Sequence, residues 1–285
     1  MGVKERLKRF VGIWIDVFAR HKLLDHAGAI AFAVLKALIP LTLLGLAMLG
    51  AFDEEQVWHK TIAPAIEPHL QRATFHAVNA SVERIFESDS TGLIAFASLL
   101  ALWYISGSVR AVMGAFNDIY ETEETRGLMH RYVLSVSLAA GIAIGVIGAL
   151  LAAIVLGHIS APEPLRIVFQ VGRWFAAIAL LAGALELLVR FGPVEPRPNK
   201  WVSAGTILVI VAWIGASLIF ELFVSHVANF KTAIGSLTVF LVAIGYVYTS
   251  SIILLVGIEL DELLLEDATH GERGVLQVLF GVGKS

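Results

Sequence analysis

Three ionisable side chains lie inside long apolar stretches of the sequence, where a charge is costly. Lys36 interrupts AIAFAVLKALIPLTLLGLAMLG at residues 29–50, and Glu186 and Glu221 interrupt two later stretches. A charged side chain at the centre of a membrane-spanning helix costs about 2.5–3.5 kcal/mol on insertion scales. Residues of this kind commonly mark the pathway of an ion or a substrate. The chemistry they indicate is therefore the binding and movement of a charged solute.

Glu186 is the acid best placed to pair with Lys36. At a rise of about 1.5 Å per residue, Lys36 lies about 13 Å inside the first apolar stretch, and Glu186 lies within one helical turn of that depth. Glu221 lies more than about 15 Å away along the membrane normal. In the alternative, Glu186 pairs with Arg190, its i+4 neighbour, and the Lys36 amine extends to the membrane surface.

Other candidates accompany this pair. Pro40 removes a backbone hydrogen bond one turn after Lys36 and favours a kink that would open a small polar cavity. Arg110, at the end of the second apolar stretch, would bind a phosphate or another anion, or else anchor its helix at the membrane surface. Carboxylates at the ends of the stretches, such as Glu259, are expected to be solvated at little cost. The candidate pathway residues are Lys36, Pro40, Glu186, Arg190, Arg110, Asn117, Glu221 and Glu259.

Motifs for catalysis and metal binding are not found in the sequence. It has no HExxH pair, no Gly-x-Ser-x-Gly turn and no phosphate-binding glycine loop. It contains no cysteine, which excludes disulfides and thiolate metal sites. His69 and His76 would lie about 10 Å apart along a helix, too far to share a metal. We expect no catalytic residue, no metal, no cofactor and no enzyme activity, ribonuclease activity included.

Membrane-spanning helices are the elements that would position the candidate residues. Of the 285 residues, 57% are hydrophobic and 16% are charged. The apolar residues come in continuous blocks of about 20, the length that crosses a bilayer as a helix. We predict an all-α polytopic membrane protein with six transmembrane helices, at about 27–49, 92–110, 133–157, 174–191, 201–225 and 237–258.

Lysine and arginine residues orient these spans. Fourteen of the 21 basic residues fall before the first span and after the second, fourth and sixth, whereas six fall in the remaining loops. The positive-inside rule therefore places both termini in the cytoplasm. The predicted organisation is a cytoplasmic N-terminal segment (1–26), a six-helix domain (27–258) and a cytoplasmic tail (259–285).

Two segments outside the spans have amphipathic patterns. Residues 3–24 predict a helix that lies on the cytoplasmic membrane surface with lipids as its partner, or one that caps the bundle. Residues 53–91 predict an external helical hairpin whose turn is marked by Pro64 and Pro68. The apolar stripe of that hairpin is expected to rest on the outer mouth of the bundle, and its residues are Phe75, Val78, Val82, Ile85 and Phe86.

Small residues repeat every four positions along the third span. They are Gly141, Gly145, Ala149, Ala153 and Gly157. This spacing lets another helix approach closely, either a helix of the same chain or one of a second copy in a homo-oligomer. The net charge of −3 and the lack of a dense basic cluster favour no nucleic-acid partner.

Several short motifs carry a family resemblance. In the second half they are Trp213, Phe220, Phe223, Gly235-Ser236-Leu237, the region 246–250 and Gly257-x-Glu259. In the first half they are DHAGAIAFAVLKALIP (25–40) and FNDIYETEETR (116–126). With these motifs the chain resembles the YihY/virulence factor BrkB family over nearly its whole length. The resemblance implies six spans in the bacterial inner membrane with both termini in the cytoplasm.

The residue patterns and the resemblance together favour one function over its alternatives. We expect a transporter or flippase-like protein that moves a lipid or another amphipathic or anionic solute across the cytoplasmic membrane. The alternative is a non-catalytic scaffold for envelope biogenesis, which would hold its partners with the small-residue stripe and the external loop. The family's older label, ribonuclease BN, is regarded as a misassignment.

Overall fold

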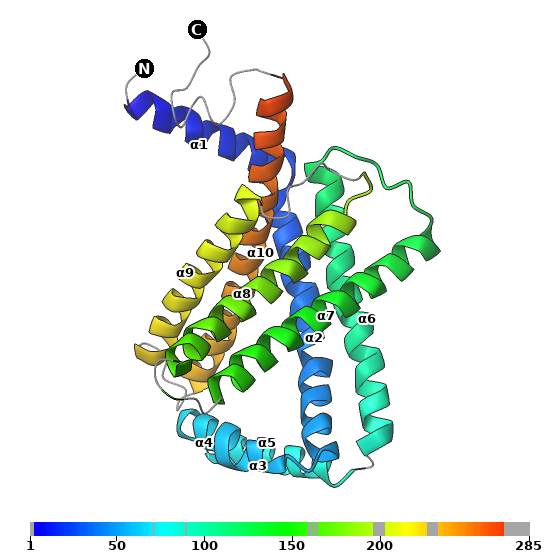
Figure 1. Cartoon of the computed structure of the whole chain (residues 1–285), viewed down its shortest axis with the longest axis vertical. Coiled ribbons are helices and arrows are strands. Elements are labelled where there is room, and N and C mark those ends of the chain that lie inside the picture. The colour runs from blue at the N-terminus through cyan, green and yellow to red at the C-terminus, as the bar shows by residue number, and fades with distance from the viewer. Residues whose placement is uncertain are drawn as a thin grey trace. The chain divides into compact units, whose positions relative to one another are not determined.

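The chain is helical throughout the part that the structure describes. The computed structural model describes residues 3–70, 72–88, 90–158, 162, 165–195, 203–226 and 233–270 (Figure 1). Within these ranges the chain forms helices and short connections, and no strand. This confirms the all-α prediction.

Within the described residues, six helices are long and apolar enough to cross a membrane. They are α2 (Leu23–Ala51), α6 (Ser90–Ile119), α7 (Leu128–His158), α8 (Leu165–Phe191), α9 (Ala204–His226) and α10 (Ala233–His270). Each predicted span coincides with one of them, which confirms the number of spans. The fifth begins at Ala204 rather than at 201, and residues 201–202 lie outside the described part of the chain.

The second span and the polar helix that follows it are one element. α6 has 30 residues and continues to Ile119 without interruption. No proline occurs between residues 90 and 119, so the ladder of backbone hydrogen bonds continues past the membrane boundary. The extension has an apolar face that is buried, at Val109, Val112, Phe116, Ile119 and Tyr120.

The described residues form two compact units. Unit 1 comprises residues from 1–27, 109–212 and 252–285, and unit 2 comprises 28–108 and 213–251. Unit 1 thus contains α1 (Val3–Arg20), α7 and α8 together with parts of α2, α6, α9 and α10. Most of the polar side chains described below belong to unit 1.

Within unit 1, α7 and α8 lie side by side (Figure 1). A Cβ on Gly141 would lie 2.5 Å from a methyl group of Leu187, and one on Gly145 would lie 2.9 Å from the Cβ of Ala184. The Leu187 methyl group can move aside, but the Ala184 Cβ cannot move without the backbone of α8, so the small-residue stripe receives α8 of the same chain at Gly145. This is the first of the two packing alternatives. The side-chain packing of Ala153 and Gly157 lies outside the described residues.

The segment between α2 and α6, in unit 2, forms two helical arms. The first arm consists of α3 (Glu55–Val57), a π-helical turn (Trp58–Ile62), α4 (Ala63–Ile66) and a 3₁₀ turn (Glu67–His69); the second is α5 (Arg72–Phe86). Leu70, with φ −104° and ψ 157°, ends the first arm next to Pro68. The prediction that Pro64 marks the turn is therefore wrong. Pro64 lies in the first turn of α4, where its fixed φ suits a helix.

The apolar stripe of α5 forms the hairpin's own core. Phe75, Val78, Val82 and Phe86 pack with Trp58 and its neighbours on the first arm and with Leu46 near the end of α2. The indole Nε1 of Trp58 donates a hydrogen bond of 2.8 Å to Asn79 Oδ1. The stripe was expected to rest on the outer mouth of the bundle; packing against the first arm instead buries it within the hairpin.

Candidate functional site

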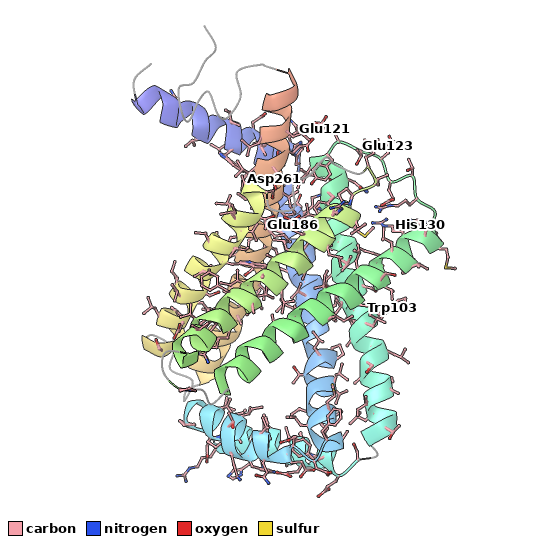
Figure 2. All side chains as sticks on the ribbon, in the orientation of Figure 1. Trp103, Glu121, Glu123, His130, Glu186 and Asp261 are labelled. Carbon is pink, nitrogen blue, oxygen red and sulfur yellow. The ribbon has the colours of Figure 1, made fainter. Side chains whose placement is uncertain are left out.

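Polar side chains of unit 1 gather where α6 and α8 end and where α7 and α9 begin (Figure 2). Successive antiparallel helices bring these four ends to one level, and α10 and the α1–α2 junction contribute further groups. We call this set the polar layer, and it consists of His21, Asn117, Glu124, Arg126, Glu186, Thr206 and Glu259.

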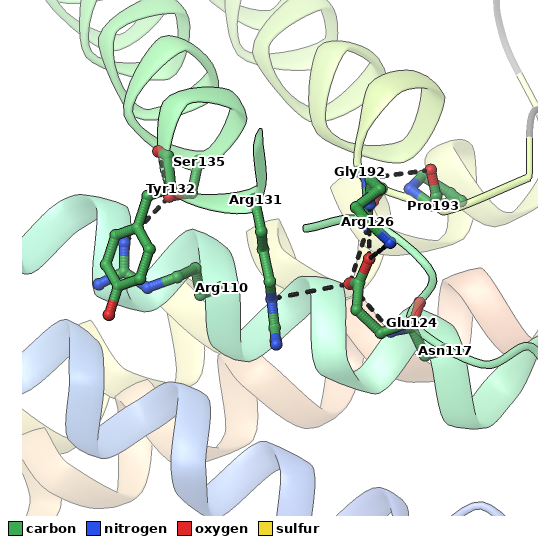
Figure 3. Close-up of polar contacts among 9 residues, drawn as sticks. All are labelled: Arg110, Asn117, Glu124, Arg126, Arg131, Tyr132, Ser135, Gly192 and Pro193. Carbon is green, nitrogen blue, oxygen red and sulfur yellow. Dashed lines mark hydrogen bonds and ion pairs between the residues drawn. The ribbon is translucent and has the colours of Figure 1, made fainter. Parts of the chain in front are cut away.

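An arginine in the α6–α7 loop joins that loop to the end of α8 (Figure 3). The Arg126 guanidinium donates to both carboxylate oxygens of Glu124, from Nε at 2.7 Å and from Nη2 at 3.1 Å. It also donates to the backbone carbonyls of Gly192 at 3.1 Å and Pro193 at 3.4 Å. These carbonyls follow the last turn of α8, where acceptors lack helical partners and a cation is favoured. Arg126 therefore fixes the loop against α8.

The loop can reach this position because of how α6 ends. The Thr122 N–H donates to the Asn117 carbonyl at 2.8 Å, and the Glu121 N–H donates to the Asp118 carbonyl at 3.4 Å. This is a Schellman motif, in which the residue after the helix adopts a left-handed conformation. Glu121 has φ 49°, although glycine is preferred there. The chain thus retains a strained glutamate beside the polar layer.

The environment of Glu124 favours its ionised form. The hydrogen bond from Arg126 lowers the pKa of the Glu124 carboxyl from 4.5 to about 2, and the bond from Asn117 adds to this effect, whereas burial opposes it. Asn117 Nδ2 donates to Glu124 Oε2 at 3.3 Å. The Asn117 Oδ1 atom is buried and has no hydrogen-bond partner among the described residues.

Glu186 is buried in α8 and is bonded to the first turn of α9. Its side chain is only 8% exposed, and its Oε1 accepts a hydrogen bond of 2.5 Å from the Thr206 hydroxyl. Ser203 caps α9, because its Oγ accepts the Thr206 N–H at 3.0 Å. The role predicted for Glu186 stays a prediction, and the contact that the structure shows is with Thr206.

Glu259 is also buried, in α10, at 1% exposure. Its Oε2 lies 2.8 Å from Nδ1 of His21, which belongs to the junction between α1 and α2. The other ring nitrogen of His21 lies 3.7 Å from the carboxylate of Glu121, which is exposed. The expectation that Glu259 is solvated at the end of a span is therefore wrong. The helix continues beyond it to His270, and His21 covers it.

Lys36 is exposed on α2. Its Nζ lies 4.5 Å from the centroid of the Phe32 ring, one turn nearer the N-terminal end of the helix. This is the direction that the alternative requires, in which the amine extends toward the membrane surface. Lys36 belongs to unit 2 and Glu186 to unit 1, and their pairing stays a prediction. Pro40 is buried, and α2 is unbroken across it.

Three further candidates lie at helix surfaces or ends. Arg110 is half-buried, donates to Ser135 Oγ at 3.0 Å and lies 4.4 Å from the centroid of the Tyr132 ring, so it links α6 to α7 (Figure 3). This contact fits an anchoring role. Arg190 and Glu221 are exposed on α8 and α9.

Sequence reasoning missed His21, Thr206 and the Glu124–Arg126 pair. A glutamate two residues before an arginine in the segment ETEETR is a local signal that could have identified the last of these. Nothing local connects His21 or Thr206 with an acid. Among the described residues, no group of three or more His, Asp or Glu residues is arranged to hold a metal ion.

Comparison with known proteins places the sequence of this chain in a family. The profile of the family described as "Virulence factor BrkB" matches residues 14–276 of the chain. The chain belongs to the virulence factor BrkB family. That match includes every member of the polar layer, from His21 to Glu259.

Two curated proteins are similar to this BrkB-family chain. One, from Bacillus subtilis (strain 168), carries the provisional name ribonuclease-like protein YfkH; it is 24% identical over 207 residues, which cover 70% of this chain and 75% of that protein. The other is a UPF0761 membrane protein from Alkalilimnicola ehrlichii, 22% identical over 253 residues, which cover 87% of this chain but 56% of that protein. No solved structure matches the chain significantly.

Proposed function

We propose that this BrkB-family protein moves a lipid or another amphipathic or anionic solute across the cytoplasmic membrane of a bacterium. The observation that carries the proposal is the burial of two carboxylates, Glu186 at 8% and Glu259 at 1% exposure, in helices that are otherwise apolar enough to span a membrane. Ionisable groups are rarely retained in such helices without a role in a pathway.

The partners of these acids support a site that can exchange its contacts. Thr206 offers Glu186 a neutral hydroxyl, and His21 offers Glu259 a ring nitrogen that can either donate or accept a hydrogen bond. These two contacts are with a hydroxyl and an imidazole rather than with the permanent charge of a lysine or an arginine, which would hold a carboxylate more strongly. The buried Oδ1 of Asn117 adds an acceptor that lacks a described partner. Leaving such a group unbonded costs about 1–3 kcal/mol, so a water molecule or a polar group of the solute is expected to bind there.

The orientation belongs to the same proposal. Both termini are placed in the cytoplasm because the basic residues concentrate in the segments on that side. The polar layer lies in and beside the loops that carry Arg126 and Arg131, so it would lie at the cytoplasmic end of the spans. A solute would therefore meet it on entry from, or release to, the cytoplasm.

The scaffold alternative has less support from the structure. It depended on the small-residue stripe of α7, and α8 occupies that stripe at Gly141 and Gly145. The name of the Bacillus subtilis relative raises ribonuclease activity, and we propose that this chain lacks it. Purified protein incubated with structured and unstructured RNA tests that proposal, since cleavage that co-purifies with the chain would contradict it.

Reconstitution tests the transport proposal. Purified full-length chain in liposomes is expected to accelerate the reorientation of a fluorescent phospholipid, measured as the fraction accessible to a membrane-impermeant quencher. Glu186→Gln and Glu259→Gln are expected to slow it, while Glu87→Gln, at an exposed position, is the matched control. Equal rates in protein-free liposomes, or equal rates in all three variants, would contradict the proposal.

A further inference from the structure

A groove lies in the elbow where α1 meets the start of α2. Its volume is about 670 Å³, and its walls are mainly apolar. Val11 and Ile15 of α1 and Leu24 of α2 line it, and they are 46%, 65% and 49% exposed. The volume falls within the range of about 300–1,000 Å³ that is usual for small-molecule sites. Val11 and Ile15 lie outside the spanning helices, and apolar side chains this exposed there indicate a surface that a ligand covers.

The elbow that forms the groove is held in one conformation. Lys22 has φ 49°, a left-handed conformation that reverses the chain between the two helices. On one side of it His21 bonds Glu259 of α10 at 2.8 Å, and on the other Leu23 is 1% exposed. Trp14 and Phe18 form an edge-to-face pair with ring centroids 6.1 Å apart and line the same wall. A groove that is already formed binds a ligand without the cost of ordering its walls.

The groove lies at the level where lipid headgroups are expected. The first candidate span begins at Leu23, directly after Lys22, so the elbow coincides with the end of the apolar stretch. A tryptophan beside such a boundary is typical of the interface between membrane and water. The apolar walls would then be reached by the acyl chains of one leaflet.

Two opposite charges line the groove one turn apart. Lys22 and Asp25 are both exposed, and within the described part of the chain neither forms an ion pair. Arg20, in contrast, pairs with Asp16 at 2.9 Å. A lysine favours a phosphate, and a carboxylate favours a cation that can donate hydrogen bonds.

We propose that this groove binds one phospholipid whose headgroup carries both a phosphate and a primary ammonium group. The phosphate would contact Lys22, the ammonium would donate to Asp25, and an acyl chain would lie along Ile15 and Leu24. Asp25 would repel a purely anionic headgroup. A trimethylated ammonium group has no N–H to donate to the Asp25 carboxylate. The site needs no transport activity, so it goes beyond the function proposed above.

Native mass spectrometry of the full-length chain in detergent tests the site. The probes are phosphatidylethanolamine, phosphatidylglycerol and phosphatidylcholine with identical acyl chains, each titrated alone. The first is expected to bind tightest, with one copy retained per chain. Asp25→Asn is expected to reduce the preference for phosphatidylethanolamine over phosphatidylglycerol about fivefold, the size of effect expected of one exposed charge. Lys22→Gln is expected to weaken the binding of all three lipids. Lys60→Gln and Asp53→Asn, exposed charges of unit 2, are the matched controls.

Three results would overturn the proposal. One is equal affinity for the three lipids, and another is binding that neither Asp25→Asn nor Lys22→Gln changes. The third is a lipid-free dimer of the wild-type chain together with a monomeric Ile15→Asn variant. That result would mean that a second copy of the chain covers the groove. Quenching of tryptophan emission by brominated phosphatidylethanolamine, reduced in Trp14→Phe by the contribution of that residue, gives an independent readout if a charge variant proves unstable.

Discussion

Replacing Glu124 by glutamine tests whether the α6–α7 loop depends on its ion pair with Arg126. The substitution removes the negative charge but keeps a side chain of the same shape. Arg126 retains the carbonyls of Gly192 and Pro193, so the loop can still dock. The expected effect is therefore a loss of stability rather than a loss of fold.

The magnitude follows from the pKa of the Glu124 carboxyl. It falls from 4.5 to about 2 in the folded chain. Each pKa unit corresponds to about 1.4 kcal/mol, so the ionised carboxylate stabilises the folded state by about 3 kcal/mol. The side chain is 18% exposed, and the glutamine amide can still accept one bond from Arg126. We expect Glu124→Gln to cost about 2 kcal/mol, or about 4–8 °C in the midpoint of thermal unfolding.

The dependence on pH has a definite sign. The folded-state pKa is lower than that of the unfolded chain, so the stabilisation is complete above about pH 4.5 and is lost as the pH falls toward about 2. The difference between the wild type and Glu124→Gln should therefore stay constant from neutral pH down to about pH 5. Below that it should shrink, because the wild-type carboxyl becomes protonated.

The assay is thermal unfolding of purified protein in one detergent, followed by circular dichroism across this pH range. Glu123→Gln is the matched control, because Glu123 is an exposed acid in the same loop. It should change the free energy of unfolding by less than about 0.5 kcal/mol. If the two variants unfold at the same temperature at neutral pH, or if their difference does not depend on pH, the inference about the Glu124–Arg126 pair is refuted.

Three further substitutions test other parts of the fold, the first two by thermal unfolding and the third by proteolysis. Glu121→Gly should raise stability by about 0.5–1 kcal/mol, because glycine removes the strain of φ 49°; a lower midpoint would contradict this. Gly145→Val should cost about 1–3 kcal/mol by forcing α7 from α8, whereas Gly172→Ala, whose Cβ meets nothing within 4 Å, should not destabilise the chain. Trp58→Phe should make the hairpin more sensitive to protease by removing a hydrogen bond to Asn79 worth about 1 kcal/mol; an unchanged cleavage rate would argue against that role.

The helices could be predicted because hydropathy and length decide them. A block of about 20 apolar residues satisfies its backbone in a membrane only as a helix, so each block specified one element. The extension of α6 was also predictable, since Val109, Val112 and Phe116 continue an apolar face at helical spacing. These features depend on neighbours within a few turns of the same helix.

The hairpin turn was less predictable because proline has two different effects on a helix. It interrupts a helix from within but fits the first turn of one. Pro64 takes the second role at the start of α4, and the turn falls at Leu70, which carries no turn signal of its own. The packing of α5 on the first arm fixes the turn. Val82 and Trp58 belong to one buried cluster although they are 24 residues apart, and no local sequence pattern predicts that contact.

The contacts of the buried acids could not be predicted from neighbouring residues in the sequence. Glu186 was identified from its position in an apolar stretch, but Thr206 reaches it only because α9 begins beside that turn of α8. The register of α9 is set by a close approach: a Cβ on Gly205 would collide with the carbonyl oxygen of Gly257 on α10. Two glycines 52 residues apart thus help to place Thr206, and neither has a pattern that reveals the other.

Glu259 shows why the end of an apolar stretch does not mark the end of the buried part of its helix. The apolar block stops near residue 258, so the acid was expected to meet solvent. The next residues, ELDELLLEDATH, lack glycine and proline and favour a helix, and α10 continues through them to His270. The last apolar turn is therefore followed by more helix, against which His21 can pack, and the acid becomes buried. In this chain α6 and α10 extend beyond their apolar stretches, and two buried polar residues of the polar layer, Asn117 and Glu259, lie in those extensions.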